Sequence, residues 1–232
     1  MILALDTSTA FASAALFDGE SLRAETTWET GTSATQQLLP AVEHLLQLAG
    51  GRPTQIRGIA VALGPGSFNG LRVALSFGKG LASALAIPIV GFPTPDIAAY
   101  PFSSLVLPVC AILKLGRNRL VCTHFQTRYG RWQRISDFRN LTLEALIQET
   151  DRTTVFCGEI DRQMAATLQE RLGRRALLAS AALSARRAGY LAEMAWRRLQ
   201  EEPEGDDLVS LQPIYLSPPR LGGAGAPVEE KD

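Results

Sequence analysis

The chain has 232 residues, enough for one large domain or for two lobes of about 100 residues each. Its composition, 46% hydrophobic and 20% charged, is that of an ordinary globular protein. The 23 basic and 23 acidic side chains cancel, which excludes a global electrostatic field that would attract nucleic acid or an anionic membrane.

The amino-terminal segment MILALDTS enters a strand with no basic flank and no cleavage site, and no uncharged apolar run is long enough to span a bilayer. We therefore expect a cytoplasmic protein with no membrane contact. Cys110, Cys122 and Cys157 are too few and too scattered for a disulfide framework or a C-x-x-C metal site. Cys110 and Cys122 could face each other across a hairpin, where two reduced thiols are favoured over a disulfide.

Three strands are expected first, over residues 2–6, 13–17 and 22–28, because apolar residues alternate there and turn residues separate them. They form an antiparallel meander. A helix capped by Ser33 or Thr35 should then run to about residue 48, with apolar residues at helical spacing.

The most informative stretch is GIAVALGPGSFNGLRVALSFGKGLASALA, residues 58–86. It predicts a buried strand, a turn rich in glycine and proline, and a helix that starts near Ser67 or Phe68. Free N–H groups and the helix dipole make such a start a candidate anion cradle. Neither a P-loop nor a dinucleotide fingerprint is present, since Leu71 and Arg72 follow Gly70 and Asn69 stands where a third glycine is needed.

The helix that follows this turn is apolar around nearly its whole circumference, with small residues between the large ones. A helix of that kind must be buried on all sides. A lobe this small covers one face, so we expect a partner chain on the other, in preference to simple burial in the chain's own centre.

The strand over residues 2–6 ends in a polar group, Asp6, Thr7 and Ser8. One interpretation is a turn carboxylate that accepts local N–H bonds. The other is a nucleotide-phosphate cleft, in which these side chains face the glycine-rich turn, and the residues alone leave both open. The candidate cleft residues are Asp6, Thr7, Ser8, Gly64, Pro65, Gly66 and Ser67.

After a strand at residues 87–90 and a short helix at 94–100, the order of elements starts again near residue 105. The second half predicts strands at 105–113, 119–125, 131–135, 153–157 and 176–178, and helices at 143–149, 159–172 and 183–201. This repetition indicates an internal duplication. The predicted division is a first lobe over residues 1–102, a second over 103–216, with LQPIYL near its end as a docking segment anchored by Tyr215, and a disordered tail over 217–232.

We find no catalytic residues and no metal ligands in the pattern. His44 and His124 have no second ligand at metal spacing, and no G-x-S-x-G elbow frames Ser67. The strand end that matches Asp6 in the second half carries Leu113, Lys114 and Leu115, so a second carboxylate for metal-assisted phosphoryl transfer is missing.

A basic patch is expected on the last helix and beside it. Its arginines are Arg171, Arg174, Arg175, Arg186, Arg187, Arg197 and Arg198. A solvated helix face explains them better than an RNA contact, because no aromatic residues for base stacking are interleaved.

Four segments carry a family resemblance: ILALDTSTAFASAALFDG, TQQLLPAVEHLL, GIAVALGPGSFNGLRVALSFGKGLA and IVGFPTPD. Together they resemble the TsaB family of tRNA threonylcarbamoyladenosine biosynthesis proteins, long grouped with the glycoprotease-like M22 proteins. The resemblance is specific over residues 1–96, chiefly through GPGSFNGLR, and weak afterwards apart from LQPIYLSPP. Two departures stand out: Ala34 replaces a histidine common before the TQ, and LKLGRNR replaces an Asp-Ala-Arg type motif in the second lobe.

The resemblance implies an α/β fold with two duplicated lobes of the actin, Hsp70 and sugar-kinase type, which is ribonuclease H-like. It also implies a non-catalytic paralogue of TsaD that works in forming N6-threonylcarbamoyladenosine at position 37 of tRNAs reading codons that start with A. Its partners would be the transferase TsaD and the ATPase TsaE, with tRNA bound only as part of the complex. No cofactor is expected beyond a vestigial nucleotide in the cleft.

By the same resemblance, pairing uses two first-lobe helices, at residues 36–48 and 69–86. The expected interface residues are Gln37, Leu38, Val42, Leu45, Leu71, Ala74, Leu75, Gly78, Leu81, Ala82 and Leu85. A homodimer through the same helices stays open. On this basis Gly78→Leu or Leu81→Asp should abolish pairing and leave the monomer folded.

Two rivals of other classes remain. One is an enzyme of the same fold, either a glycoprotease-like hydrolase or a small-molecule kinase. The other is a stand-alone RNA-binding module that uses the arginine patch.

Overall fold

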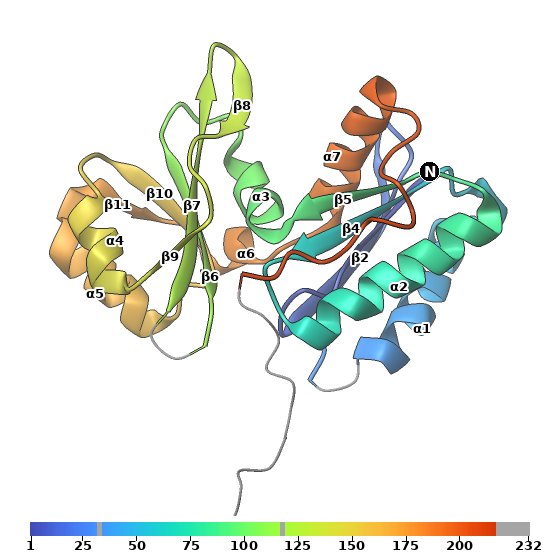
Figure 1. Cartoon of the computed structure of the whole chain (residues 1–232), viewed down its shortest axis with the longest axis horizontal. Coiled ribbons are helices and arrows are strands. Elements are labelled where there is room, and N and C mark those ends of the chain that lie inside the picture. The colour runs from blue at the N-terminus through green and yellow to red at the C-terminus, as the bar shows by residue number, and fades with distance from the viewer. Residues whose placement is uncertain (32–33, 117–118, 217–232) are drawn as a thin grey trace, which may run out of the picture.

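The computed structural model describes residues 1–31, 34–116 and 119–216. These residues form two lobes that stand side by side, each built on one mixed sheet (Figure 1). The first sheet has the order β3-β2-β1-β4-β5. The predicted antiparallel meander of β1 to β3 is present, and β4 pairs in parallel with β1 and β5. Its strands are β1 (Ile2–Asp6), β2 (Phe11–Phe17), β3 (Leu22–Glu29), β4 (Gly58–Gly64) and β5 (Ile89–Pro93).

The second sheet has the order β11-β10-β6-β7-β8, which repeats the topology of the first. A short strand that the sequence analysis missed, β9, pairs with β7. The strands are β6 (Val109–Lys114), β7 (Leu120–Arg128), β8 (Arg131–Arg134), β9 (Arg139–Leu141), β10 (Thr154–Gly158) and β11 (Ala176–Leu178). The predicted internal duplication is therefore confirmed.

The two repeats share one backbone detail. The strands β4 and β10 both end on a glycine with positive φ, Gly64 at 100° and Gly158 at 95°. Such angles lie in the left-handed region that L side chains rarely adopt. Three residues later, Ser67 and Asp161 cap the helices α2 (Phe68–Leu85) and α5 (Arg162–Leu172), each accepting a backbone N–H.

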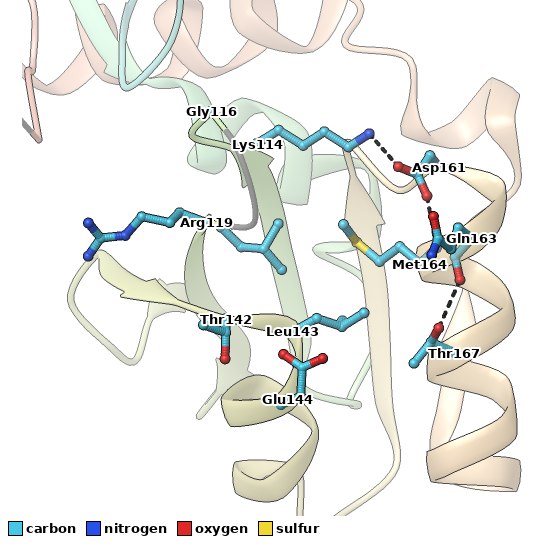
Figure 2. A pocket seen from close by; sticks show the side chains of 11 residues that line it. Lys114, Gly116, Arg119, Thr142, Leu143, Glu144, Asp161, Gln163, Met164 and Thr167 are labelled. Atoms are coloured by element: carbon cyan, nitrogen blue, oxygen red, sulfur yellow. Dashed lines mark hydrogen bonds and ion pairs between the residues drawn. The ribbon is translucent and has the colours of Figure 1, made fainter.

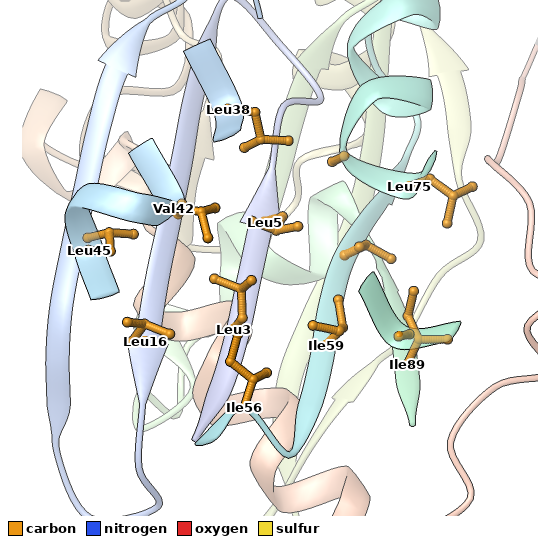
Figure 3. Packing of buried hydrophobic residues seen from close by; sticks show 14 of the residues in the cluster. Leu3, Leu5, Leu16, Leu38, Val42, Leu45, Ile56, Ile59, Leu75 and Ile89 are labelled. Carbon is orange, nitrogen blue, oxygen red and sulfur yellow. The ribbon is translucent and has the colours of Figure 1, made fainter. Parts of the chain in front are cut away.

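Helices α1 (Ala34–Leu48) and α2 cover one face of the first sheet, and the core of this lobe lies between them and the strands (Figure 3). Leu38, Val42 and Leu45 of α1 follow the spacing of one helical face and are buried there. In the second lobe, α4 (Leu143–Glu149) and α5 pack on the corresponding face of the sheet. Single 3₁₀ turns lie at Pro53–Gln55, Tyr100–Phe102 and Gly173–Arg175.

The last helix of each half crosses to the other lobe. Helix α7 (Ala188–Glu201), from the second half, packs on β1 and β2 of the first sheet through Ala188, Leu191 and Ala195. Helix α3 (Thr94–Ala99), from the first half, packs on β6 and β10 of the second. The lobes are therefore tied together by exchanged helices.

The predicted second lobe over residues 103–216 is consequently wrong at its carboxyl end. Besides α7, the segment after it returns to the first lobe, where the Ile214 N–H donates to the Leu63 carbonyl at 2.7 Å and the Asp206 carboxylate accepts the Gly91 N–H at 2.7 Å. The Tyr215 ring lies against that of Phe68, with centroids 5.3 Å apart, as the docking interpretation of LQPIYL predicted. The second lobe proper ends near residue 185. The single helix predicted over residues 183–201 is divided into α6 (Ala181–Ser184) and α7.

The first lobe covers one face of helix α2, as expected for a lobe of this size. Leu71, Ala74, Leu75, Gly78 and Ala82 face the sheet. The opposite side is open, with Arg72, Ser76, Gly80 and Ser83 exposed. The chain's own sheet thus covers one face, and the small residues on the other leave the helix backbone accessible.

Three expectations fall outside the described residues, namely the Ser33 cap, the turn at residues 117–118 and the tail at 217–232. Among the described residues, no helix combines the length and apolar character that crossing a membrane requires.

Gly78 and Gly80 offer a matched test of how α2 is packed. A Cβ on Gly78 would lie 2.9 Å from Val61 Cγ1, whereas one on Gly80 would meet nothing within 4 Å. We expect Gly78→Leu to lower the free energy of unfolding by about 1–3 kcal/mol through overpacking. Gly80→Leu should raise it by up to about 1 kcal/mol, because leucine favours the helix more than glycine does. Urea denaturation of both variants measures the difference, and equal stabilities would contradict the packing described.

Candidate functional site

The end of β1 lies directly against the start of α2. The Thr7 hydroxyl donates to the Gly70 carbonyl at 2.6 Å and accepts the Ala74 N–H at 3.2 Å. The Ser67 N–H donates to the Ser8 carbonyl at 2.6 Å. A Cβ on Gly66 would come within 2.2 Å of that same carbonyl, so glycine there permits the close approach of the two segments.

This arrangement brings the predicted cleft residues together but turns their polar groups toward one another. The Ser67 N–H is used by Ser8, and the Gly70 N–H is used by the Ser67 hydroxyl at 3.3 Å. The predicted anion cradle is therefore partly filled by the chain itself. Pro65 follows Gly64 through a cis peptide bond.

Asp6 is 1% exposed and is fully engaged. Its Oδ1 accepts the N–H of Ser8 at 2.8 Å and the hydroxyl of Ser8 at 2.6 Å. Its Oδ2 accepts from Nε of Arg186 at 3.2 Å. The structure shows the first interpretation of Asp6, a carboxylate that accepts a local N–H bond. The nucleotide-phosphate interpretation stays a prediction.

Arg186 is the residue of this site that the sequence analysis missed. It lies between α6 and α7, its side chain is 6% exposed, and it also donates to the Thr9 hydroxyl. Its Nη1 lies 3.9 Å from Oε1 of Glu159, at the end of β10 in the second lobe. The guanidinium thus holds a carboxylate of each lobe. The sequence held a signal for a break in the helix at this point. Arg187 stands four residues after Leu183 and four before Leu191, where a continuous amphipathic helix needs an apolar residue.

Little space remains where the lobes meet. The cavity there measures about 150 Å³ and is lined by Ser8, Pro65 and Ser67 of the first lobe and by Lys114 and Glu159 of the second. Pockets that hold a drug-sized molecule measure roughly 300–1,000 Å³. The cavity where the lobes meet is smaller than such pockets. A second cavity, of about 290 Å³, is lined by Thr7, Ser67, Asn69 and Gly70 of the first lobe.

Four of the seven arginines of the predicted basic patch, Arg186, Arg187, Arg197 and Arg198, pair with carboxylates. Arg187 binds Glu25 with Nε 2.7 Å from the carboxylate, Arg197 pairs with Glu193 at 2.6 Å, and Arg198 pairs with Asp206 at 2.5 Å. The solvated helix face explains these side chains only where they are exposed, since Arg186 is buried. The patch offers few free cations on α7 for nucleic acid.

A larger cavity, of about 560 Å³, lies in the second lobe between the starts of α4 and α5 (Figure 2). Lys114 spans its upper edge to Asp161, at 2.6 Å, and Leu120, Leu143 and Met164 supply apolar surface. The remaining lining residues are Gly116, Arg119, Thr142, Glu144, Gln163 and Thr167. None of the predicted site residues lies here, and the two cations and two carboxylates balance in charge.

The residues expected to face a partner need a correction. Leu38, Val42, Leu45, Leu71, Ala74, Leu75, Gly78 and Ala82 are buried in the first lobe's own core, because they form the sheet-facing sides of α1 and α2. Gln37, Leu81 and Leu85 are half-buried, and Gln37 accepts a hydrogen bond from the Trp28 indole at 3.0 Å. Gly78→Leu should therefore lower the stability of the first lobe itself, contrary to the expectation that it would leave the monomer folded and abolish only pairing.

Among the described residues, no cluster of three or more His, Cys, Asp and Glu side chains could hold a metal ion. The cysteines are free and buried, as predicted. Burial raises the pKa of Cys157 to about 12, and the neighbouring Cys122 with burial raises the pKa of Cys110. Thiols that stay protonated at neutral pH are poor nucleophiles and poor metal ligands.

Comparison with known proteins decides the family. A family model described as TsaD, tRNA N6-adenosine threonylcarbamoyltransferase, matches residues 30–221. The chain belongs to this family. Within it, the resemblance to TsaB is confirmed: the chain is 28% identical to the TsaB of Bacillus subtilis over 221 residues, 93% of each chain.

Solved structures agree with this placement. YeaZ from Pseudomonas aeruginosa superimposes with a TM-score of 0.73 at 25% identity, over 93% of this chain and 99% of that one. The ethanolamine utilization protein EutJ from Carboxydothermus hydrogenoformans has a TM-score of 0.50 at 12% identity, over 82% of this chain and 88% of that one, which concerns the fold alone. The predicted two-lobed actin-like α/β fold is confirmed.

Removing Arg186 should strand a buried carboxylate. We expect Arg186→Met to lower the free energy of unfolding by about 3–5 kcal/mol, because the buried Asp6 side chain would lose its partner. The double variant Asp6→Asn/Arg186→Met should recover part of that loss. Arg197→Met is the matched control, since it breaks an exposed pair worth about 0–1 kcal/mol. Urea denaturation measures all three, and a cost for Arg186→Met as small as the control's would refute the role given to this ion pair.

Proposed function

We propose that this chain is a non-catalytic scaffold or activating subunit in the biosynthesis of threonylcarbamoyladenosine on tRNA. Its catalytic partner is a TsaD-like transferase, and a TsaE-like ATPase works with the pair. The family supports the pathway, since the matched model is described as a tRNA N6-adenosine threonylcarbamoyltransferase and the Bacillus subtilis relative as a biosynthesis protein of the same modification.

The proposal that the chain is non-catalytic rests on Arg186. Its guanidinium lies between the carboxylates of Asp6 and Glu159 and forms an ion pair with each. Phosphoryl transfer in two-lobed enzymes needs room for a nucleotide and a carboxylate available to its metal. In this chain the carboxylate at the end of β1 is bound by Ser8 and Arg186, and a cavity of about 150 Å³ lies beside it. No cofactor is needed for a scaffold role.

The kinase and hydrolase rivals find little support in the described residues. Ser136 lies 3.5 Å from Nδ1 of His124, but its hydroxyl also accepts the His124 N–H at 2.8 Å, so it serves a local turn. Burial lowers the pKa of His124, with Arg139 adding to the effect. A serine held in this way lacks the third group that orients a catalytic histidine.

The surface proposed for the partner is the outer side of α1 and α2, which run next to each other on the outside of the first lobe (Figure 1). Leu39 of α1 is 50% exposed, and Val73, Phe77 and Leu81 of α2 are half-buried. A Cβ on Gly80 would meet no atom within 4 Å, so this glycine leaves the surface of α2 open. An apolar surface with a glycine lets another helix approach closely, and the same surface also suits a second copy of the chain.

The pairing surface can be tested without disturbing the core. Leu39→Asp/Gly80→Glu places two charges on the outer side of α1 and α2, where a close helix contact would have to bury them. We expect the free energy of unfolding to change by less than about 1 kcal/mol. Affinity for the TsaD-like transferase should fall more than about tenfold, and threonylcarbamoyl transfer to tRNA in a reconstituted mixture should fall with it.

The control is Ala166→Glu, an exposed alanine on α5 of the other lobe. It should leave co-purification with the transferase intact. Omitting each component of the reaction in turn completes the test. Turnover by this chain alone, or undiminished pairing of the double variant, would contradict the proposal.

A further inference from the structure

We propose that the tip of the β7–β8 hairpin, residues 128–131, is a contact site for RNA with unpaired bases. Its sequence is Arg-Tyr-Gly-Arg. The inference rests on the proposed function, because it is that pathway which brings tRNA to this chain. It concerns a surface distinct from the arginines of α7, which are paired within the chain.

The turn itself contains a residue that does not suit it. Arg128 pairs with Arg131 across the hairpin, which leaves Tyr129 and Gly130 as a two-residue loop with φ values of 51° and 73°. Two-residue loops with positive φ at both positions favour Asn-Gly or Asp-Gly. Tyrosine is unfavourable there, since a bulky L residue is strained in the left-handed region.

Tyr129 does not compensate by packing. Its side chain is fully exposed, and the described residues offer it no ring partner. A strained residue that contributes nothing to the core is expected at positions that act on something outside the chain.

The charges around Tyr129 are unbalanced. Arg128 and Arg131 are exposed, and neither forms an ion pair with a carboxylate of the described residues. Arg128 donates to the Gln126 amide oxygen at 3.2 Å. The sequence contains no Asp or Glu between residues 97 and 136, so no carboxylate on either strand of the hairpin offsets these cations.

The tip is held outward on a firm base. The Trp132 ring stacks on Phe125, with centroids 5.5 Å apart and an interplanar angle of 11°. The Thr127 hydroxyl donates to the Ser103 carbonyl at 2.6 Å. The hairpin projects beyond the rest of the second lobe (Figure 1). An aromatic ring between two guanidinium groups, presented in this way, can stack on an unpaired base while the cations bind the flanking phosphates.

Tyr129→Asn separates binding from stability. Asparagine suits the turn better than tyrosine, so the melting temperature should stay the same or rise, whereas affinity for an unmodified tRNA transcript should fall about tenfold. Tyr129→Phe keeps the ring and should bind like the unsubstituted chain. Fluorescence anisotropy with a labelled transcript measures both, for the full chain alone and for the full chain together with the transferase.

The arginines have their own signature. Arg128→Ala/Arg131→Ala should reduce the slope of log affinity against log salt by about 1.4, the loss of two phosphate contacts. Arg52→Ala/Arg162→Ala, which removes two exposed arginines outside both the hairpin and the arginine patch, is the matched control and should leave the slope unchanged.

RNA affinity that ignores both Tyr129→Asn and the arginine pair would overturn the inference, as would an absence of tRNA binding. It would also be overturned if the tip variants weakened co-purification with the transferase and left RNA affinity intact, since the tip would then be a protein contact. Failure of the proposed function would be seen separately, because the unsubstituted chain would then not pair with the transferase.

Discussion

The buried ion pair between Asp6 and Arg186 is the interaction on which the relation of the two lobes depends. Its partners stand 180 residues apart in sequence, and both side chains are almost fully buried. A charge in such a place is tolerated only with its counter-charge and further hydrogen bonds, which Ser8 and Thr9 supply. Glu159 of the second lobe adds a longer ion pair to the same guanidinium, at 3.9 Å.

The exchanged helices α3 and α7 also link the two lobes. Because α7 covers the first sheet and α3 the second, neither lobe completes its core from its own half of the duplication. A two-lobed enzyme uses the joint between lobes to open and close on its substrate. In this chain the joint is filled by packed helices and a buried ion pair, an arrangement that suits a rigid subunit.

Local patterns in the sequence predicted what local forces determine. The meander of β1 to β3, the apolar spacing of α1 and the glycine-rich turn before α2 are all present, because alternation, helical period and positive φ act over a few residues. The repetition of these patterns also revealed the duplication. The family resemblance then supplied the fold class.

What the sequence could not reveal depends on contacts between distant segments. Composition made α2 look apolar on all sides and could not tell which side faces the sheet. In the structure Gly80 and Ser83 lie on the open side. Arg186 looked like a member of a basic surface, since nothing near it in sequence points to Asp6. The return of residues 188–216 to the first lobe likewise depends on packing against residues far away in the sequence. A short window of neighbouring residues does not contain that information.

We propose that the chain's own side chains close the space between the lobes to nucleotide. Isothermal titration calorimetry of the full chain with ATP and Mg²⁺ tests it most directly. The account predicts no saturable heat up to millimolar nucleotide. Saturable one-site binding at micromolar concentration, abolished by Asp6→Ala, would contradict it.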